Sequence, residues 1–168
     1  MSELMNEERA AIRLGRATPI LRVREMKASV DYYVNKLGFH VQWGYPDRGE
    51  SFFASIARGD CNLFLSVGDQ GNPGAWVWID GKDVDALHEE FAAAGAKIRN
   101  PPTNYSWALE MQVEDLDGNV LRFGSDPRKG EPDGPWLDMY GDLWIRLEDG
   151  SHRKLEGTRD PGTEEPGD

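Results

Sequence analysis

Three kinds of side chain in this sequence could bind a metal or act as a nucleophile. Asp115 and Asp117 stand before Gly118 as in a calcium-binding loop, but the glycine spacing and the missing distal glutamate do not fit one. Cys61 is expected to point into the core, with no activating base nearby. The histidines fall on an exposed strand, a polar helix face and the C-terminal region: His40, His88 and His152. We therefore expect surface histidines and an inert thiol.

Residues 113–124, VEDLDGNVLRFG, place a cation on the kind of strand that carries a carboxylate ligand in many small metalloenzymes. They read as a strand, a tight turn at residues 117–119 and a returning strand that carries Arg122. Arg122 would repel a bound metal ion. Glu110 shares its face of the hairpin, so a register that placed the two opposite each other would form an ion pair. Such a cross-strand pair stabilises a sheet by about 0.2–1 kcal/mol.

The hairpin closes the second of two similar units. The stretch ILRVREMKASVDYYVNKLGFHV predicts a strand and a helix that ends at Gly38, and WVWIDGKDVDALHEEFAAAGAKI repeats the plan with Asp83 as N-cap and Gly95 as C-cap. Val23 and Ile79 occupy matching places, a shift of 79 − 23 = 56 residues. Three short strands follow each helix, so each unit is predicted to be β-α-β-β-β.

Alternation along the strands predicts which side chains lie on the sheet face that the helix leaves open. This face is expected to hold Glu110 and Arg122 on the hairpin, whereas Phe52 is expected in the core. It is also expected to hold four aromatic residues: Phe53, Phe64, Trp76 and Trp78. Aromatic residues more often complete a core than bind a ligand, but two neighbouring outward tryptophans favour binding. Since each unit leaves one face uncovered, two must pair to enclose a cleft.

Composition limits the class of protein. The 168 residues carry a formal net charge of −11, which disfavours nucleic acid and anionic membranes as partners. A single cysteine fits a reducing compartment, and the first sixteen residues do not match a signal peptide. The sequence therefore predicts a cytoplasmic protein that binds neither nucleic acid nor membrane.

The chain divides into four predicted segments. Residues 1–16 form a polar arm with a helical turn near residues 10–14, and residues 17–125 hold the two units, 17–70 and 75–125. Residues 126–157 predict a C-terminal β extension, because WLDMYGDLWIRLEDGSHRKLE alternates strands with Gly-Asp and Asp-Gly turns. Residues 158–168 have the composition of a disordered tail. The extension could cap the cleft, widen a dimer interface or cover a sheet edge, and the last is favoured.

Five stretches in order resemble the vicinal oxygen chelate (glyoxalase/bleomycin resistance/dioxygenase) superfamily, most closely its metal-free bleomycin resistance branch. They are PIL, ASVDYYVNKLGF, FASIARGDCNLFLSVGDQ, AWVWI and WALEMQVEDLDGNVLRF, and they span residues 17–124. The resemblance implies an α+β fold of two tandem βαβββ modules forming a curved mixed sheet around a cleft, here with the C-terminal β extension added. It also implies a homodimer, in which many members exchange the N-terminal strand; Pro19 stands at the hinge position.

Enzymes of this superfamily hold a divalent metal through four strand positions. By the resemblance these positions fall on Thr18, Phe64, residues 74–76 and Arg122, and none offers a strong metal ligand. The resemblance therefore implies no metal, no other cofactor and no catalytic residue, and it favours a binding protein over an enzyme.

In the metal-free branch a planar bithiazole group is sandwiched at a dimer crevice between two aromatic rings, which correspond here to Phe53 and Trp107. Trp76 and Trp78 would line the same cavity, and Glu110 could offset a ligand's positive charge. The expected function is metal-independent sequestration of a cationic, partly planar natural product of the bleomycin class, as in antibiotic resistance. Two alternatives stay open: a metabolite enzyme with a non-standard metal site, and a non-catalytic carrier or sensor.

Overall fold

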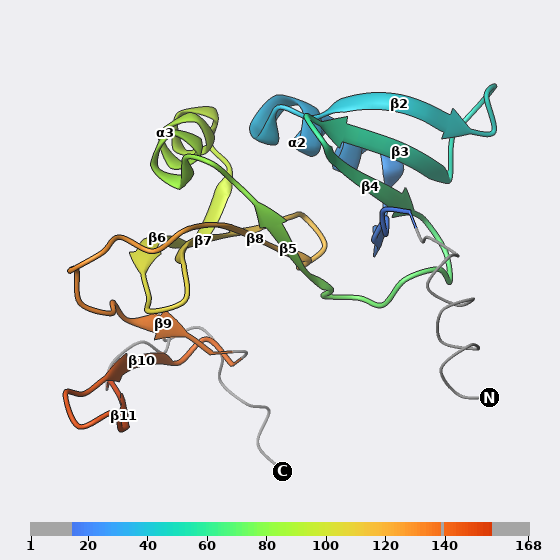
Figure 1. The fold of residues 1–168 in the computed structure, drawn as a ribbon. Helices are drawn as coiled ribbons and strands as arrows, with labels where there is room; N and C mark the ends of the chain where they lie inside the picture. The colour runs from blue at the N-terminus through green and yellow to red at the C-terminus, as the bar shows by residue number, and fades with distance from the viewer. Residues whose placement is uncertain (1–14, 139, 156–168) are drawn as a thin grey trace, which may run out of the picture.

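The computed structural model describes residues 15–138 and 140–155. The helical turn expected near residues 10–14 and the tail expected at 158–168 lie outside these ranges. Within them the chain is α+β, with two βαβββ modules followed by a small antiparallel sheet (Figure 1). This confirms the predicted fold class, and the eight module strands divide into two four-stranded mixed sheets.

The first module has the strand order β1-β4-β3-β2, with β1 parallel to β4 and the other neighbours antiparallel. Strand β1 pairs with the β4 strand of its own chain, beginning with Ile20 opposite Phe64. The elements of this module are β1 (Ile20–Arg22), α2 (Met26–Leu37), β2 (His40–Tyr45), β3 (Phe53–Arg58) and β4 (Cys61–Ser66).

The second module repeats this topology in the order β5-β8-β7-β6. Trp76 lies opposite Val120 in the parallel pair, so both partners are displaced from their counterparts in the first module by the shift that the sequence predicts. The duplication is thereby confirmed at the level of register. The elements are β5 (Trp76–Asp80), α3 (Val84–Ala94), β6 (Lys97–Asn104), β7 (Leu109–Glu114) and β8 (Val120–Ser125).

Local signals fix both helix ends. The Glu25 carboxylate caps α2 by accepting from the backbone N–H groups of Lys27 and Ala28, and Asp83 caps α3 as predicted. Gly38 and Gly95 end the helices with φ of 67° and 74°, left-handed values that glycine adopts without a steric penalty. Each helix therefore stops where its apolar stripe stops, and the chain turns back into its sheet.

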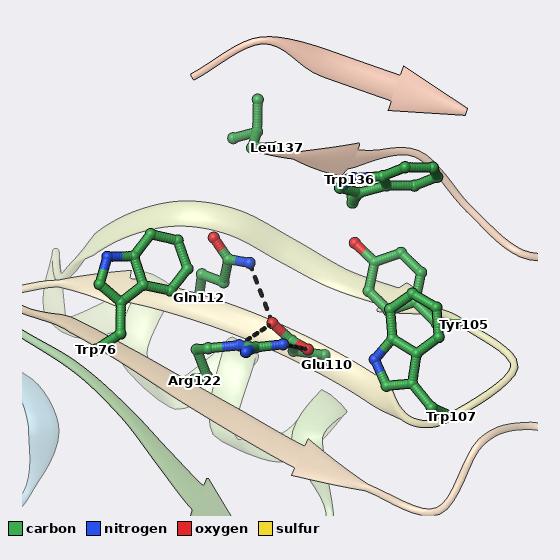
Figure 2. A pocket seen from close by; sticks show the side chains of 8 residues that line it. All are labelled: Trp76, Tyr105, Trp107, Glu110, Gln112, Arg122, Trp136 and Leu137. Carbon is green, nitrogen blue, oxygen red and sulfur yellow. Dashed lines mark hydrogen bonds and ion pairs between the residues drawn. The ribbon is translucent and has the colours of Figure 1, made fainter. Parts of the chain in front are cut away.

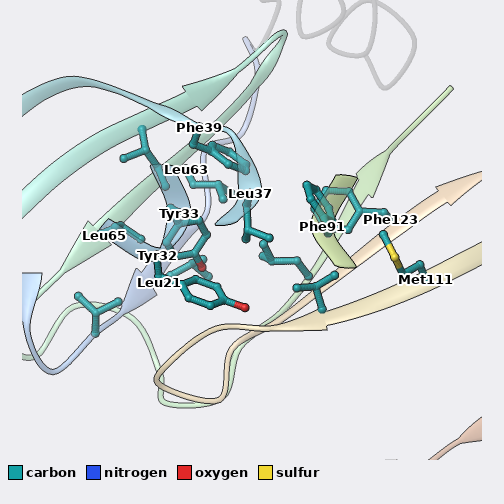
Figure 3. Packing of buried hydrophobic residues seen from close by; sticks show 14 of the residues in the cluster. Leu21, Tyr32, Tyr33, Leu37, Phe39, Leu63, Leu65, Phe91, Met111 and Phe123 are labelled. Carbon is teal, nitrogen blue, oxygen red and sulfur yellow. The ribbon is translucent and has the colours of Figure 1, made fainter. Parts of the chain in front are cut away.

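The two helices contact each other, and one hydrophobic core joins the modules (Figures 1 and 3). The β7–β8 loop ties them further: Tyr33 donates its hydroxyl to the Asp115 carboxylate at 3.0 Å, and Asn119 donates to the Arg22 carbonyl at 3.0 Å. Because the helices lie on this inner side, the open sheet faces look away from each other. The core includes Leu21, Tyr33, Leu37, Leu63, Leu65, Phe91, Met111 and Phe123.

Strand faces follow the predicted alternation, with one exception. Glu110 and Arg122 share the face opposite the core, and both Trp76 and Trp78 are more than 40% exposed on β5. Phe52 was expected in the core, but it precedes β3, is 48% exposed and meets Tyr45 edge to face. The backbone of Phe52 still bonds to Tyr45 and Val67, but the residue stands outside β3 at the end of the sheet, and its side chain is not part of the core.

The C-terminal extension forms the predicted antiparallel meander, in the order β11-β10-β9. Its strands are β9 (Trp136–Leu137), β10 (Leu143–Arg146) and β11 (His152–Lys154). It is held beside β6 by bonds from the Gly134 amide to the Asn104 carbonyl, 2.7 Å, and from the Tyr105 hydroxyl to the Pro135 carbonyl, 3.0 Å. No helix among the described residues is long and apolar enough to cross a membrane.

Candidate functional site

A pocket of about 380 Å³ lies on the open face of the second module, between its sheet and the C-terminal extension (Figure 2). Strands β7 and β8 supply its floor, the β6–β7 loop supplies one aromatic wall, Trp76 of β5 lies across from that wall, and β9 lies above (Figure 2). The pocket is lined by Trp76, Tyr105, Trp107, Glu110, Gln112, Arg122, Trp136 and Leu137.

An ion pair forms the floor. Arg122 donates from Nε and Nη2 to the two Glu110 carboxylate oxygens at 2.8 and 2.7 Å, and Gln112 adds a third hydrogen bond to that carboxylate at 3.0 Å. Glu110 is only 1% exposed, so the pair satisfies a buried charge. The bond to Glu110 raises the pKa of Arg122 above its ordinary value, although partial burial opposes this.

The predicted ion pair is thus confirmed, but along the diagonal of the hairpin. Residue Gly124 lies opposite Glu110, and Gln112 lies opposite Arg122. The long side chains of Glu and Arg span this diagonal easily. Arg122 also places its guanidinium 5.4 Å from the centre of the Trp78 ring, a cation–π contact that holds it flat against the sheet.

Stacked rings form the wall beside the β6–β7 loop. Tyr105 and Trp107 lie 4.8 Å apart and nearly parallel, at 7°. Trp107 is 57% exposed, whereas Tyr105 is buried and raises its pKa to about 12, first through burial and then through the nearby Glu110 charge. A buried, hydrogen-bonded tyrosine thus supports an exposed indole that is free to stack on a ligand.

The extension is anchored to this site by Arg99. Its Nη2 donates to the Asp138 carbonyl at 2.8 Å, its Nε donates to Gln112 at 3.3 Å, and its guanidinium lies 5.3 Å from the centre of the Trp76 ring. Trp136 and Leu137 thereby become part of the pocket. The extension therefore does more than cover the β6 edge, the role favoured from the sequence: it caps the pocket as well.

A second hollow of about 520 Å³ continues from the pocket past Trp107, which lines both. Trp78 lies here and donates its indole N–H to Asp80 at 2.7 Å. The Asp80 and Asp126 carboxylates give this hollow an acidic character, offset only by Lys82. The pocket and the adjoining hollow together form one groove, which is aromatic and rich in hydrogen-bond donors at one end and acidic at the other.

The structure brings together part of the predicted site. Trp76, Trp107, Glu110 and Arg122 share one pocket, and Trp78 lies in the adjoining hollow. Phe53 and Phe64 lie on the other module, 5.3 Å apart, and do not line the pocket. Within one chain the expected sandwich of Phe53 and Trp107 is therefore not formed.

Several residues at these sites were missed from the sequence. Trp43 stacks on Phe53 at 5.9 Å on the first module, where the two help line a hollow of about 520 Å³. Gln112 lies on the same face of β7 as Glu110, so alternation could have found it, and Tyr105 stands two residues before Trp107. No sequence signal points to Arg99 or Trp136, because their role depends on how the extension folds back.

The residues at the family's metal positions do not fit a metal. Phe64 packs among aromatic rings, and Arg122 is a cation bonded to the Glu110 carboxylate. Among the described residues no three His, Cys, Asp or Glu side chains are grouped so as to hold an ion. Arg122 and Glu110 therefore form an ion pair with each other and offer no ligands for a metal ion.

Comparison with known families gives one match. A model described as "Glyoxalase/Bleomycin resistance protein/Dioxygenase superfamily" matches residues 13–123, which include both modules and most of the pocket floor. The comparison with curated proteins found no match.

Among solved structures, the bleomycin-binding protein from Streptomyces verticillus in complex with copper(II)-bleomycin is 28% identical, with a TM-score of 0.57 over 70% of this chain and 99% of that one. TioX from Micromonospora sp. ML1 is 24% identical, with a TM-score of 0.57 over 66% and 98%. TnmS3, an antibiotic-binding protein from Streptomyces sp. CB03234, is 21% identical, with a TM-score of 0.57 over 70% and 99%. The last two likenesses show the fold alone.

Proposed function

Because the chain belongs to the glyoxalase/bleomycin resistance/dioxygenase superfamily, we propose that it binds and sequesters a partly planar, cationic natural product of the bleomycin class without a metal. The observation that carries the proposal is the Arg122–Glu110 pair, which fills a family metal position beneath the aromatic walls. The bleomycin-binding protein among the similar structures supports the ligand class.

The groove separates the two kinds of contact that such a ligand needs. A planar group stacks on Trp107, which Tyr105 supports from behind, and each such ring pair contributes about 0.5–1.5 kcal/mol beyond burial. A cationic group meets Asp80 and Asp126 in the adjoining hollow. Glu110 does not take this role, contrary to the expectation from the sequence, because it is buried and its oxygens are bound to Arg122.

We further propose that the working form is a homodimer. Since the open faces look away from each other, Phe53 can complete a sandwich with Trp107 only if it comes from a second copy. The Trp43, Phe53 and Phe64 cluster offers the aromatic surface for this contact, and exchange of β1 at Pro19 is compatible with it. The proposed compartment is the reducing cytoplasm, which the single cysteine supports.

Titration calorimetry with metal-free bleomycin, with tryptophan fluorescence followed in parallel, tests the proposal. We expect saturable heat and quenching, and we expect both to persist unchanged in EDTA. Trp107→Ala should weaken binding about tenfold, because it removes the stacking ring. Tyr140→Ala is the matched control, since Tyr140 is 83% exposed and does not line the pocket. Absence of heat and quenching at high micromolar drug would refute the proposal.

A further inference from the structure

The hydrogen-bond acceptors of the pocket between the second module and the extension are already in use. Both Glu110 oxygens accept from Arg122, and one of them also accepts from Gln112. The Gln112 amide oxygen accepts from Arg99. The Tyr105 hydroxyl donates to the Pro135 carbonyl and accepts from Asn100. Among the residues that the structure describes, a ligand entering the pocket therefore finds no side-chain acceptor that is not already bonded to a donor.

The donors show the opposite pattern. Arg122 uses Nε and Nη2 for Glu110, and its Nη1 has no partner in the described part of the chain. The indole N–H groups of the lining tryptophans, which can only donate, likewise have no partner there. By contrast, the indoles of Trp78 and Trp144 outside the pocket are bonded to Asp80 and Asp138. The three unpaired indoles are those of Trp76, Trp107 and Trp136.

The local charge agrees with this distribution. Among the described residues, Glu110 and Arg122 are the only charged side chains that line the pocket, and they neutralise each other. Arg99 adds a positive charge behind Trp76. The pocket is thus neutral to positive although the whole chain carries −11. In Figure 2 the Trp107 ring turns its nitrogen to the side that faces the ion pair.

We propose that this pocket selects a planar ring system that carries hydrogen-bond acceptors at its edge: a carbonyl, ring nitrogens or a carboxylate. Arg122 Nη1 and the Trp107 indole N–H, which face the pocket in Figure 2, donate to these acceptors, and Trp136 of the extension closes the pocket above Tyr105. The inference rests on the proposed function and names the chemistry of the planar part of the ligand. A donor or cation at that edge would leave several N–H groups unpaired on binding, which costs affinity.

Three probes with one ring system test the proposal: anthracene-2-carboxylate, anthracene-2-carboxamide and anthracen-2-ylmethylammonium. Binding is followed by anthracene fluorescence anisotropy at 0.15 M salt, where charges beyond about 8 Å are screened. The carboxylate should bind at least about tenfold more tightly than the ammonium, with the carboxamide between them. Equal or tighter binding of the ammonium would overturn the proposal, and this comparison needs no variant.

Two matched double variants locate the preference. Glu110→Gln with Arg122→Gln removes the guanidinium without leaving a buried charge, and should bring the carboxylate and ammonium affinities within about threefold. Arg58→Gln with Glu90→Gln removes a similar two-bond pair outside the pocket, and should leave the tenfold ratio intact. A ratio that survives in the Glu110/Arg122 variant contradicts the proposal.

Trp107→Phe is a milder variant that keeps a ring and removes one donor on an exposed side chain. It should narrow the ratio of carboxylate to ammonium affinity by about threefold, whereas an unchanged ratio would argue against the indole donors.

Bleomycin titrations in parallel separate the two proposals. Carboxylate preference without bleomycin binding rejects the ligand class alone, and bleomycin binding with ammonium preference rejects the acceptor rule alone.

Discussion

At the residue scale, the character of the site depends on one arginine. Arg122 lies on β8, bonded to the Glu110 carboxylate and with the Trp78 ring 5.4 Å from its guanidinium. Its side chain is 33% exposed, whereas that of Glu110 is 1% exposed. The carboxylate therefore depends on the guanidinium for compensation, while the guanidinium keeps one edge open to the pocket.

Removal of this guanidinium should destabilise the protein. We expect Arg122→Met to lower the free energy of unfolding by about 2–4 kcal/mol, because Glu110 is left as a buried charge without a counter-ion. Lys27→Met removes an exposed helix ion pair and should cost about 0.5 kcal/mol or less. Urea denaturation measures both, and equal losses would show that the floor pair has no special role. Adding Glu110→Gln to Arg122→Met should recover part of the loss.

Tyr105 should titrate abnormally. Its phenol has a pKa of about 12 in the folded protein, raised first by burial and then by the Glu110 charge, against about 10 when unfolded. Since the folded pKa is raised, the stabilisation from the neutral phenol is complete below pH 10 and is lost as pH rises through 12. Absorbance at 295 nm should show one tyrosine step near pH 12 that disappears in Tyr105→Phe. Its survival in the variant would assign the step to another tyrosine.

At the element scale, the β7–β8 hairpin and the extension have separate tasks. The hairpin carries the ion pair on one face and core residues on the other, and its loop binds the first module through Asp115, Asp117 and Asn119. The extension brings Trp136 to the pocket and is organised by Asp138. The Asp138 carboxylate accepts from the Trp144 indole at 2.9 Å and from two backbone amides. The hydrogen bonds to Asp138 thus hold the part of the extension that carries Trp136 in place beside the pocket.

The extension should loosen in acid. Burial tends to raise the pKa of Asp138, but the bonds from Trp144 and the backbone amides lower it further, so its net pKa is depressed. A depressed pKa gives stabilisation that is present above the unfolded value of about 4 and is lost as pH falls below it. Hydrogen exchange of the β9–β11 amides should accelerate below pH 4 before that of β7 and β8. Asp138→Ala should accelerate it already at pH 7.

The sequence predicted what local patterns control. Strand alternation, helical period and turn chemistry predicted the module duplication and the open sheet faces. They also predicted the helix caps at Asp83, Gly38 and Gly95. The hairpin register was not readable, since the loop covers residues 115–119 and places Gly124 opposite Glu110, two residues beyond Arg122. Trp136 could not be found, because its contact with the site depends on a fold-back that no local signal encodes.

At the scale of the whole molecule, the core lies between the modules and the binding faces lie outside. Helices α2 and α3 occupy the inner side, so each sheet turns its aromatic face away from the other module (Figure 1). Trp43 is 45% exposed, with Phe53 and Phe64 packed beside it. A single chain therefore presents two separate faces, one aromatic and one with both aromatic and charged residues.

This arrangement predicts self-association. Sedimentation equilibrium should give twice the chain mass, and Trp43→Arg together with Phe53→Arg should shift the protein to monomer by placing charges in the aromatic face. Arg substitutions at Leu116 and Tyr140, exposed apolar sites outside that face, should leave the mass unchanged. A wild-type monomer at micromolar concentration would contradict the homodimer, though not binding of a ligand by one chain.

The anchoring of the extension by Arg99 has a consequence for protease resistance. Arg99 joins the Asp138 carbonyl to the Trp76 and Gln112 side of the pocket, so a ligand that bridges Trp76 and Trp136 binds only the docked form of residues 131–155. By linkage, occupancy at a hundred times Kd stabilises that form by about 2.7 kcal/mol. Cleavage in the Pro- and Gly-rich stretch before β9 should then slow by up to about a hundredfold. The rate of proteolysis therefore measures ligand binding even when the ligand has not been identified.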